Sequence, residues 1–429
     1  MKNKTTLFWF RRDLRLEDNT ALHYALKSSN NVLPLFIFDD DILDSLPKDD
    51  ARVSFIHSTL ENINKKLTEF GSSLIVKKGS TLDVWKALIQ EYNIERVFFN
   101  KDYEPYAIKR DLEISELLNS KGIETKSFKD QVIFEENDIL KNDNTPYTVF
   151  TPFKNKWLKA FDKTVDLSDF KIDTSKFHKH NTPFPTIEDI GFIRSKIRVK
   201  HYNLIALKNY DTVRDFPAED KTSYLSPHLR FGLVSTRKMV EIALETNAVF
   251  LSELIWREFF MQILFHFPKV VTDNFKQKYD AIPWRNNEEE FKAWCEGKTG
   301  YPMVDAGMRQ LNKTGYMHNR VRMVTAGFLC KHLLIDWRWG EAYFAEKLLD
   351  YELSANNGNW QWAAGTGCDA APYFRVFNPA EQLRKFDKNT EYIRTWVEDY
   401  DELTYPQPIV EHKFARERAI STYKKALNP

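Results

Sequence analysis

The sequence predicts an α/β domain followed by an all-α domain. In the first part of the chain, short apolar runs with strand character alternate with segments of helical periodicity. That alternation is typical of a parallel sheet covered by helices on both faces. From about residue 201 onward, apolar residues keep helical spacing and strand alternation does not return. We therefore expect an α/β domain at 1–130, a linker at 131–200 and a helical domain at 201–429.

Each element of the α/β domain follows from this alternation. Strands are expected at 7–10, 32–38, 74–77, 96–100 and 125–128, with helices between them at 19–27, 51–70, 82–92 and 105–120. Gly71 and Gly122 follow two of these helices, at the position where glycine commonly ends a helix. No G-x-G-x-x-G motif follows the first strand, so this domain need not hold the main cofactor.

The rest of the chain divides at about residue 200. The segment 131–200 has no periodicity and is rich in Lys, Asp, Asn, Thr and Pro, which indicates a long surface connection. Beyond it, helical spacing of apolar residues predicts helices at 252–267, 319–334 and 343–349.

Composition excludes several classes of protein. The 429 residues carry a net charge of +1, so any DNA binding must use a local basic face. The three cysteines are scattered, and no Cys/His spacing indicates a metal. No apolar run is long enough to span a membrane, and the N-terminus lacks a signal-peptide core. We expect a cytoplasmic protein without a metal.

The segment 356–362, Asn-Asn-Gly-Asn-Trp-Gln-Trp, is the most informative motif. On a helix, residues two apart point in nearly opposite directions, so Trp360 and Trp362 would serve different surroundings. Indole is easily oxidised and offers a flat stacking surface, which suits electron transfer on one side and ligand stacking on the other. The alternative is that both rings are core residues.

Three further segments carry polar groups suited to a ligand. Ser226 is expected to cap a helix that has Pro227 at its first position, and with Thr222 and Ser223 it would form a phosphate site. The alternative is simple helix capping.

In the second segment, Glu253, Trp256 and Phe260 share one helical face, as if lining a cavity. Glu253 and Arg257 could also form an ordinary surface ion pair. In the third, Asn319 and Met323 share a face suited to a base. Arg320 and Arg322 could meet phosphate or a buried carboxylate, with Asp350 and Glu352 as candidates.

These motifs together resemble the photolyase/cryptochrome family. The run Phe8–Arg15 resembles the family's start, and the segments 222–227, 253–259, 300–306, 315–323, 356–362 and 371–379 follow in the family's order. The resemblance spans nearly the whole chain and is closest to class I photolyases that repair cyclobutane pyrimidine dimers in DNA. It implies a Rossmann-like antenna domain, a helical FAD-binding domain and a monomer.

The resemblance also implies the cofactor-binding residues. FAD would be held in a folded conformation by Tyr210, Thr222, Ser223, Tyr224, Leu225, Ser226, Arg322, Asp350, Tyr351, Glu352 and Asn356. Asn356 would face the flavin N5, and Glu352 stands where the family has aspartate. Trp360, Trp337 and Trp284 match the tryptophan chain that photoreduces the flavin, although Trp337 could be plain core and Trp284 a surface ring.

The implied substrate is a pyrimidine dimer flipped out of the duplex, a mode of access for which photolyases are a standard example. Trp256 and Trp362 would flank it, and Glu253, Asn319 and Met323 would complete the pocket. The DNA contacts near the lesion would be Arg214, Arg257, Arg320 and Gln382. Reduced FAD, excited by light, would donate an electron that opens the cyclobutane ring and then returns.

Two other functions fit the same resemblance. A (6-4) photolyase would carry histidine at the position of Asn319, and a cryptochrome would act as a blue-light photoreceptor without repair. An antenna chromophore could be methenyltetrahydrofolate, a deazaflavin or a second flavin. Glu104 stands where folate-type members bind theirs, or it simply begins the following helix.

Overall fold

The computed structural model describes residues 4–427, which form two compact units. The sheet unit extends from the first strand to Asp138 and adds Lys159–His201 and Leu225–Glu245. The helical unit contains Ile139–Leu158, Tyr202–Tyr224 and the chain from Thr246 onward. Each unit is thus assembled from several segments. The contiguous boundaries at 130 and 200 remain a prediction.

The sheet unit is built on five parallel strands, which confirms the predicted α/β architecture. They are β1 (Thr5–Phe10), β2 (Val32–Asp39), β3 (Ile75–Gly79), β4 (Ile94–Asn100) and β5 (Glu124–Phe128), in the order β3-β2-β1-β4-β5. Its helices are α1 (Thr20–Ser28), α2 (Asp40–Leu43), α3 (Ala51–Glu69), α4 (Thr81–Glu91), α5 (Pro105–Ser120), α7 (Lys163–Asp166), α9 (Ser226–Arg230) and α10 (Thr236–Thr246). All four helices predicted between the strands are present.

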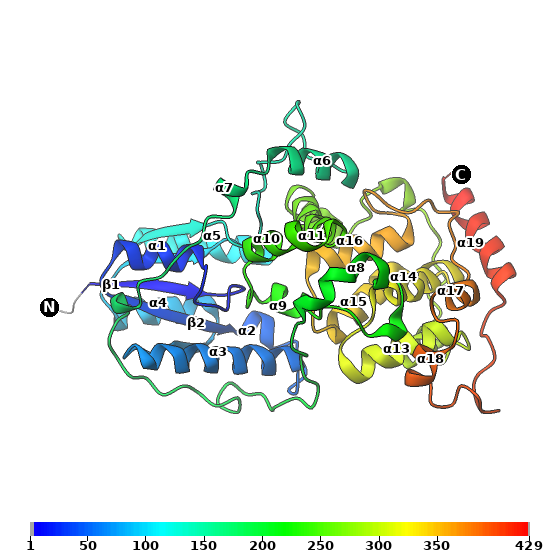
Figure 1. The fold of residues 1–429 in the computed structure, drawn as a ribbon, viewed down its shortest axis with the longest axis horizontal. Coiled ribbons are helices and arrows are strands. Elements are labelled where there is room, and N and C mark those ends of the chain that lie inside the picture. The colour runs from blue at the N-terminus through cyan, green and yellow to red at the C-terminus, as the bar shows by residue number, and fades with distance from the viewer. Residues whose placement is uncertain (1–3, 428–429) are drawn as a thin grey trace. The chain divides into compact units, whose positions relative to one another are not determined.

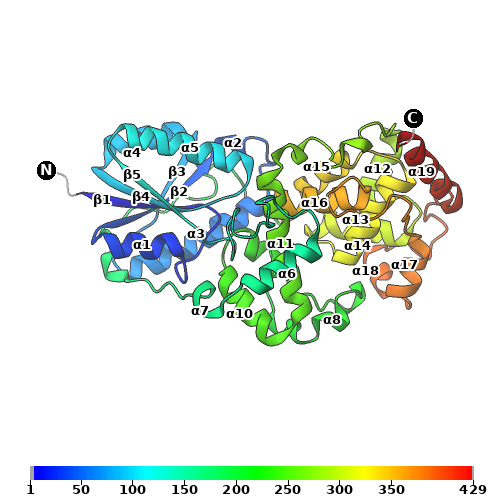
Figure 2. The same cartoon turned by 90° about the horizontal axis from the view of Figure 1, so that it is seen from above.

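Side-chain alternation along the strands explains why helices cover both faces. Phe8 and Phe10 of β1 belong to the core shared with α1 and α3, whereas Leu7 and Trp9 belong to the core shared with α4 and α5. Successive residues of a strand point to opposite faces, so a strand buried on both sides is apolar throughout. Figure 2 shows α4 and α5 on one side of the sheet and α1 and α3 on the other.

The helical unit contains the remaining helices (Figure 1). They are α6 (Phe150–Ala160), α8 (Tyr210–Val213), α11 (Ala248–His266), α12 (Glu288–Glu296), α13 (Pro302–Thr314), α14 (Asn319–Gly327), α15 (Trp337–Lys347), α16 (Leu353–Ala364), α17 (Pro379–Phe386), α18 (Glu391–Trp396) and α19 (His412–Leu427). Its short 3₁₀ segments are η2 (Leu204–Asn209), η3 (Pro217–Glu219), η4 (Pro268–Val271) and η5 (Gln277–Tyr279), whereas η1 (Thr174–Lys176) belongs to the sheet unit. Trp294, Trp337 and Trp360 lie in the largest apolar core of the helical unit.

Two sequence predictions about helices were wrong in part. The segment 131–200 contains α6, where Phe150, Phe153 and Trp157 are buried at the i, i+3 and i+7 positions of one helical face. Lysines and a proline between those rings obscured the periodicity. The helix predicted at 319–334 is divided in two. The α-helical part, α14, ends at Gly327, and a π-helical turn, η6 (Phe328–His332), follows it. Among residues 4–427, no helix is both long and apolar enough to cross a bilayer.

Candidate functional site

Helix α16 carries the central motif of the helical unit. Glu352 caps the helix, because its Oε2 accepts hydrogen bonds from the Ser354 hydroxyl and, at 2.9 Å, from the Ala355 amide. This capping explains why a glutamate is accommodated at the start of the helix. Trp360 is buried and Trp362 is half-buried, so the two indoles have the different surroundings that their spacing predicted.

Asn356 is held by a residue that sequence reasoning missed. Its Nδ2 donates to the backbone oxygen of Glu341 at 3.1 Å and to Glu341 Oε1 at 2.8 Å. Both partners are acceptors, which assigns the amide orientation and leaves Oδ1 as the acceptor of Asn356. Burial raises the pKa of Glu341, although the hydrogen bond from Asn356 opposes this. Nothing in the sequence around Glu341 indicated this role, because the pair is made across two helices.

Trp360 lies deep in the core between α15 and neighbouring helices. Its ring centroid is 4.9 Å from that of Phe344 and 6.1 Å from that of Trp294. A Cβ added at Gly340 would lie 2.2 Å from the indole, so this glycine is required for the close approach of α15. Trp294 is a second buried indole beside Trp360 that the sequence analysis did not select.

Trp337 and Trp284 belong to the same core region and differ in exposure. Trp337 is fully buried and its Nε1–H donates to Asn274 Oδ1 at 2.9 Å. Trp284 is half-buried, packs against the main core and makes an edge contact with Tyr423 at 6.0 Å. The three indoles predicted as a chain therefore run from two buried positions to one that reaches solvent. Their continuity as an electron path stays a prediction.

Glu253 pairs with Arg214, and the pairing with Arg257 that its spacing suggested is replaced. Arg214, at the end of α8, donates to Glu253 Oε1 at 2.5 Å, and the two side chains are 26% and 32% exposed. Burial raises the pKa of Glu253, with the positive charge of Arg214 acting in the opposite direction. Two residues that were predicted for different roles are thus joined in one pair.

Trp256 has one indole face already covered. Phe150 of α6 stacks on it with centroids 3.6 Å apart and planes 8° apart. Phe260, one turn further along α11, stacks on Trp256 less closely, at 5.4 Å and 28°. Trp256 is half-buried, so part of the ring stays accessible.

The arginines of α14 meet carboxylates, which was one of the two predicted alternatives. Arg322 donates to Asp350 Oδ2 at 2.9 Å and to the Met317 backbone oxygen at 2.8 Å. Arg320 pairs with Asp215 at 2.6 Å and lies 4.3 Å from the ring centroid of Phe386. The other candidates differ in exposure, with Asn319 exposed and Tyr351, Met323 and Gln382 half-buried.

The segment 222–226 has an unusual backbone. Tyr224 has a φ of 51°, and its hydroxyl donates to Asp220 while its ring meets Tyr316 edge-on at 5.1 Å. Ser226 is the first residue of α9 and Leu225 holds the cap position, so the expected cap lies one residue earlier than predicted. Ser223 is buried and Thr222 is half-buried.

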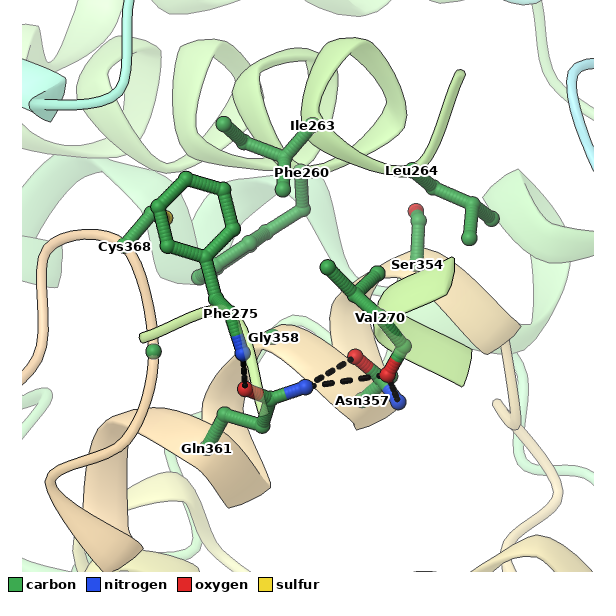
Figure 3. Close-up of a pocket in the computed structure, with 11 residues that line it drawn as sticks. Phe260, Ile263, Leu264, Val270, Phe275, Ser354, Asn357, Gly358, Gln361 and Cys368 are labelled. Atoms are coloured by element: carbon green, nitrogen blue, oxygen red, sulfur yellow. Dashed lines mark hydrogen bonds between the residues drawn. The ribbon is translucent and has the colours of Figure 1, made fainter. Parts of the chain in front are cut away.

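One cavity of the helical unit is too small for a large ligand. This cavity, between α11 and α16, is lined mainly by apolar side chains, and Asn357 and Gln361 bond across its floor to the Val270 backbone oxygen (Figure 3). Within the described part of the chain, no group of His, Cys, Asp or Glu could hold a metal ion.

The donor set of these residues fits a flavin dinucleotide better than a metal. Asn356 offers a positioned amide acceptor beside a half-buried glutamate, and Arg322 offers a cation near Asp350. Serine and threonine hydroxyls at 222–226 suit a pyrophosphate.

Comparison with known proteins agrees with this assignment. The DNA photolyase family matches residues 6–171, and the FAD binding domain of DNA photolyase matches residues 250–404. Deoxyribodipyrimidine photo-lyases from Agrobacterium fabrum and Escherichia coli are 36% and 37% identical, covering 99% and 98% of this chain and 98% and 99% of theirs.

Solved structures agree with the flavin assignment as well. A bacterial class III photolyase from Agrobacterium tumefaciens has a TM-score of 0.89 at 34% identity, with 100% of this chain and 99% of that chain covered. An archaeal photolyase from Sulfolobus tokodaii, with two FAD molecules, has a TM-score of 0.88 at 37% identity, with 98% and 100% covered. A Synechocystis cryptochrome has a TM-score of 0.84 at 25% identity, with 98% and 99% covered. The chain has the FAD-binding domain of these flavoproteins and belongs to the photolyase/cryptochrome family.

Proposed function

We propose that this protein uses light to repair cyclobutane pyrimidine dimers in DNA, as a class I photolyase. The observation that carries the proposal is the construction of α16. This one helix bears Asn356, held by Glu341, together with one buried and one half-exposed indole. The near full-length relatives named deoxyribodipyrimidine photo-lyase support the same chemistry.

The cofactor would be held by residues from several segments of the chain. Those proposed are Tyr210, Thr222, Ser223, Tyr224, Leu225, Ser226, Arg322, Asp350, Tyr351, Glu352 and Asn356. Reduced FAD supplies an electron when it absorbs near-ultraviolet or blue light. The pair between Asn356 and Glu341 fixes the amide, so that Oδ1 can accept a hydrogen bond without rearrangement. Arg322 is already oriented by Asp350.

The dimer would be bound by half-exposed aromatic rings and one ion pair. Trp256 and Trp362 provide apolar surface, and Asn319 and Met323 would contact the base edges. Glu253 would accept a hydrogen bond from an imide N–H when ionised, or donate one to a carbonyl when protonated. Burial raises the pKa of Glu253, so its carboxyl keeps a proton to a higher pH than an exposed glutamate does. Arg214, Arg257, Arg320 and Gln382 would contact the DNA near the lesion.

Trp360, Trp337 and Trp284 would carry an electron from the protein surface into the core. Two of the rings are buried and shielded from water, and the third reaches solvent, where an external reductant could restore it. Such a relay prepares the enzyme and is separate from the repair step.

The test is direct repair of a defined substrate. Reduced, purified protein is mixed with an oligonucleotide that carries one thymine dimer and is illuminated with blue light. We expect intact thymines to be restored under light and not in the dark. Retention of the dimer under light, by protein that holds its flavin, would contradict the proposal.

Two alternatives make different predictions in this assay. A photoreceptor would hold flavin and leave the dimer intact, but the cryptochrome relative is only 25% identical, against 37% for the archaeal photolyase. A (6-4) photolyase would repair the other photoproduct, but Asn319 replaces the histidine expected for it. The structure of the Agrobacterium class III photolyase also supports a class III assignment within the family.

An antenna chromophore is a separate proposal. The carboxylate of Glu104 lies 2.8 Å from Arg12 and 3.4 Å from Arg230, so it already takes part in an ion-pair cluster of the sheet unit. The archaeal relative with two FAD molecules supports a second chromophore. The absorption spectrum of native protein, before and after acid release, would identify methenyltetrahydrofolate, a deazaflavin or a flavin, or show FAD alone.

A further inference from the structure

Trp256 is the middle ring of a column of three aromatic rings that ends on α16. Phe150 of α6 lies on the indole at 3.6 Å, and Phe260 of α11 stacks on it at 5.4 Å. Phe260 in turn presses against Gly358, because a Cβ built there would lie 2.2 Å from its ring. Gly358 belongs to α16, the helix of Asn356, Trp360 and Trp362. The column therefore connects α6 and α11 to the helix proposed to face both the flavin and the lesion.

The outer ring is firmly held. Phe150 is only 6% exposed, and its backbone N–H donates to Asp369 Oδ2 at 3.0 Å, which caps the start of α6. One turn along, Phe153 packs on Phe259 with ring centroids 5.3 Å apart. Trp157, near the end of the helix, donates from Nε1 to buried Glu258 at 2.8 Å. These contacts dock α6 along α11 and leave Phe150 little freedom to move.

The inner side of the column borders a small cavity. Phe260 also lines the apolar cavity between α11 and α16, beside Ile263 and Gly358 (Figure 3). If Phe150 were absent, the indole of Trp256 would lose the ring that stacks on it at 3.6 Å and could tilt.

We infer that Phe150 is a positioning residue for lesion recognition, acting through Trp256. A pyrimidine cannot stack on the indole face that Phe150 occupies at 3.6 Å, so the dimer must contact the remaining surface of a ring whose plane Phe150 sets. The inference rests on the proposed function, because it names how one wall of the proposed pocket is held. Phe150 itself is buried and does not touch the substrate.

The experiment is a double-mutant cycle on binding in the dark. Wild type, Phe150→Ala, Trp256→Ala and the double variant are titrated with an oligonucleotide carrying one thymine dimer and with the same oligonucleotide undamaged. The readout is the ratio of the two dissociation constants. We expect Phe150→Ala to lower this preference about fivefold to tenfold, the scale of one aromatic pair. In the Trp256→Ala background, Phe150→Ala should cause no further loss.

Matched variants separate positioning from general packing. Phe150→Tyr keeps the stacked ring and should keep the preference. Phe153→Leu, on the same face of α6 but packed on Phe259, should leave the preference within about twofold of wild type. Flavin absorbance per protein reports folding, and Phe150→Leu replaces Phe150→Ala if the latter does not fold.

Each remaining outcome overturns the inference. Additive losses in the double variant would mean that Phe150 does not act through Trp256. Tighter binding by Phe150→Ala would mean that Phe150 competes with the dimer for the indole face. Wild type that holds flavin without any preference for the dimer would overturn the proposed function as well, whereas the first two results overturn the inference alone.

Discussion

Two arginine-paired aspartates of the sheet unit and two glutamates of the helical unit respond to burial in opposite ways. In the sheet unit, burial opposes ionisation of Asp102, but Arg12 and Arg230 outweigh it and lower its pKa to about 2. Asp130 is likewise held ionised, because Arg15 and Arg237 lower its pKa despite its burial. In the helical unit, burial prevails and raises the pKa of both Glu253 and Glu341.

The difference distinguishes ion pairs that hold a fold from groups that are poised for a ligand. Asp130 lies within hydrogen-bond distance of two arginines, at 2.6 Å and 2.9 Å, so its charge is already compensated. Glu253 has one arginine and a third of its side chain exposed, so it can still bind a partner. A raised carboxyl pKa in a half-buried place is a common sign of a functional site. Substitutions in both units test this division.

The largest expected effect is on the sheet unit. Asp130→Asn removes the charge that compensates Arg15 and Arg237, so we expect a loss of about 3–5 kcal/mol in the free energy of unfolding. Urea unfolding followed by circular dichroism measures it. Glu17→Gln, at a side chain that is 89% exposed, should change stability by less than about 0.5 kcal/mol. Similar losses in both variants would remove the distinction.

The next largest effect is expected from replacing one tryptophan in each unit. Trp256→Ala should weaken binding of dimer-bearing DNA about 30-fold, as expected for a central aromatic contact, while the flavin is retained. Trp85→Ala, in the core of the sheet unit, should cost about 3–5 kcal/mol of stability. It should leave the dimer preference of the folded fraction unchanged. Binding titrations and flavin absorbance give both answers, and loss of flavin from Trp256→Ala would argue for a packing role.

A smaller effect should distinguish a role of Trp360 in electron transfer from a role in packing. Trp360→Phe should slow photoreduction of the flavin at least about tenfold, a barrier increase of about 1.4 kcal/mol, and leave repair by chemically reduced enzyme nearly intact. Phe344→Leu disturbs the packing around Trp360 and keeps the indole, so photoreduction should be nearly normal. If both variants slow photoreduction equally, Trp360 serves packing.

The smallest effect is the opposite pH dependence of Asp102 and Glu253. The pKa of Asp102 is lowered from 3.8 to about 2, so its contribution to stability is present above pH 3.8 and is lost as pH falls toward 2. The pKa of Glu253 is raised from 4.5, so its contribution decreases as pH rises from 4.5 through the raised value. Urea unfolding against pH should lose the first dependence in Asp102→Asn and the second in Glu253→Gln. Identical profiles for wild type and Glu253→Gln would contradict the raised pKa.

The sequence alone predicted most of the sheet unit because its signals are local. The apolar run of β1 and the helical spacing in α3 depend only on neighbouring residues, and both elements formed as expected. Helix α6 was missed because lysines and a proline stand between its buried rings in the sequence. The opposite surroundings of Trp360 and Trp362 could also be predicted, since helical geometry fixes the angle between them.

Tertiary structure decided which partners those side chains meet. Glu253 has Arg257 one turn away on its own helix, yet it bonds Arg214 from a different element. Asn356 is oriented by Glu341 of α15, and Trp256 is covered by Phe150 from more than 100 residues earlier in the chain. Sequence periodicity shows which face of a helix is buried. Only packing determines what lies against that face, because contacts between distant segments depend on how all the elements fit together.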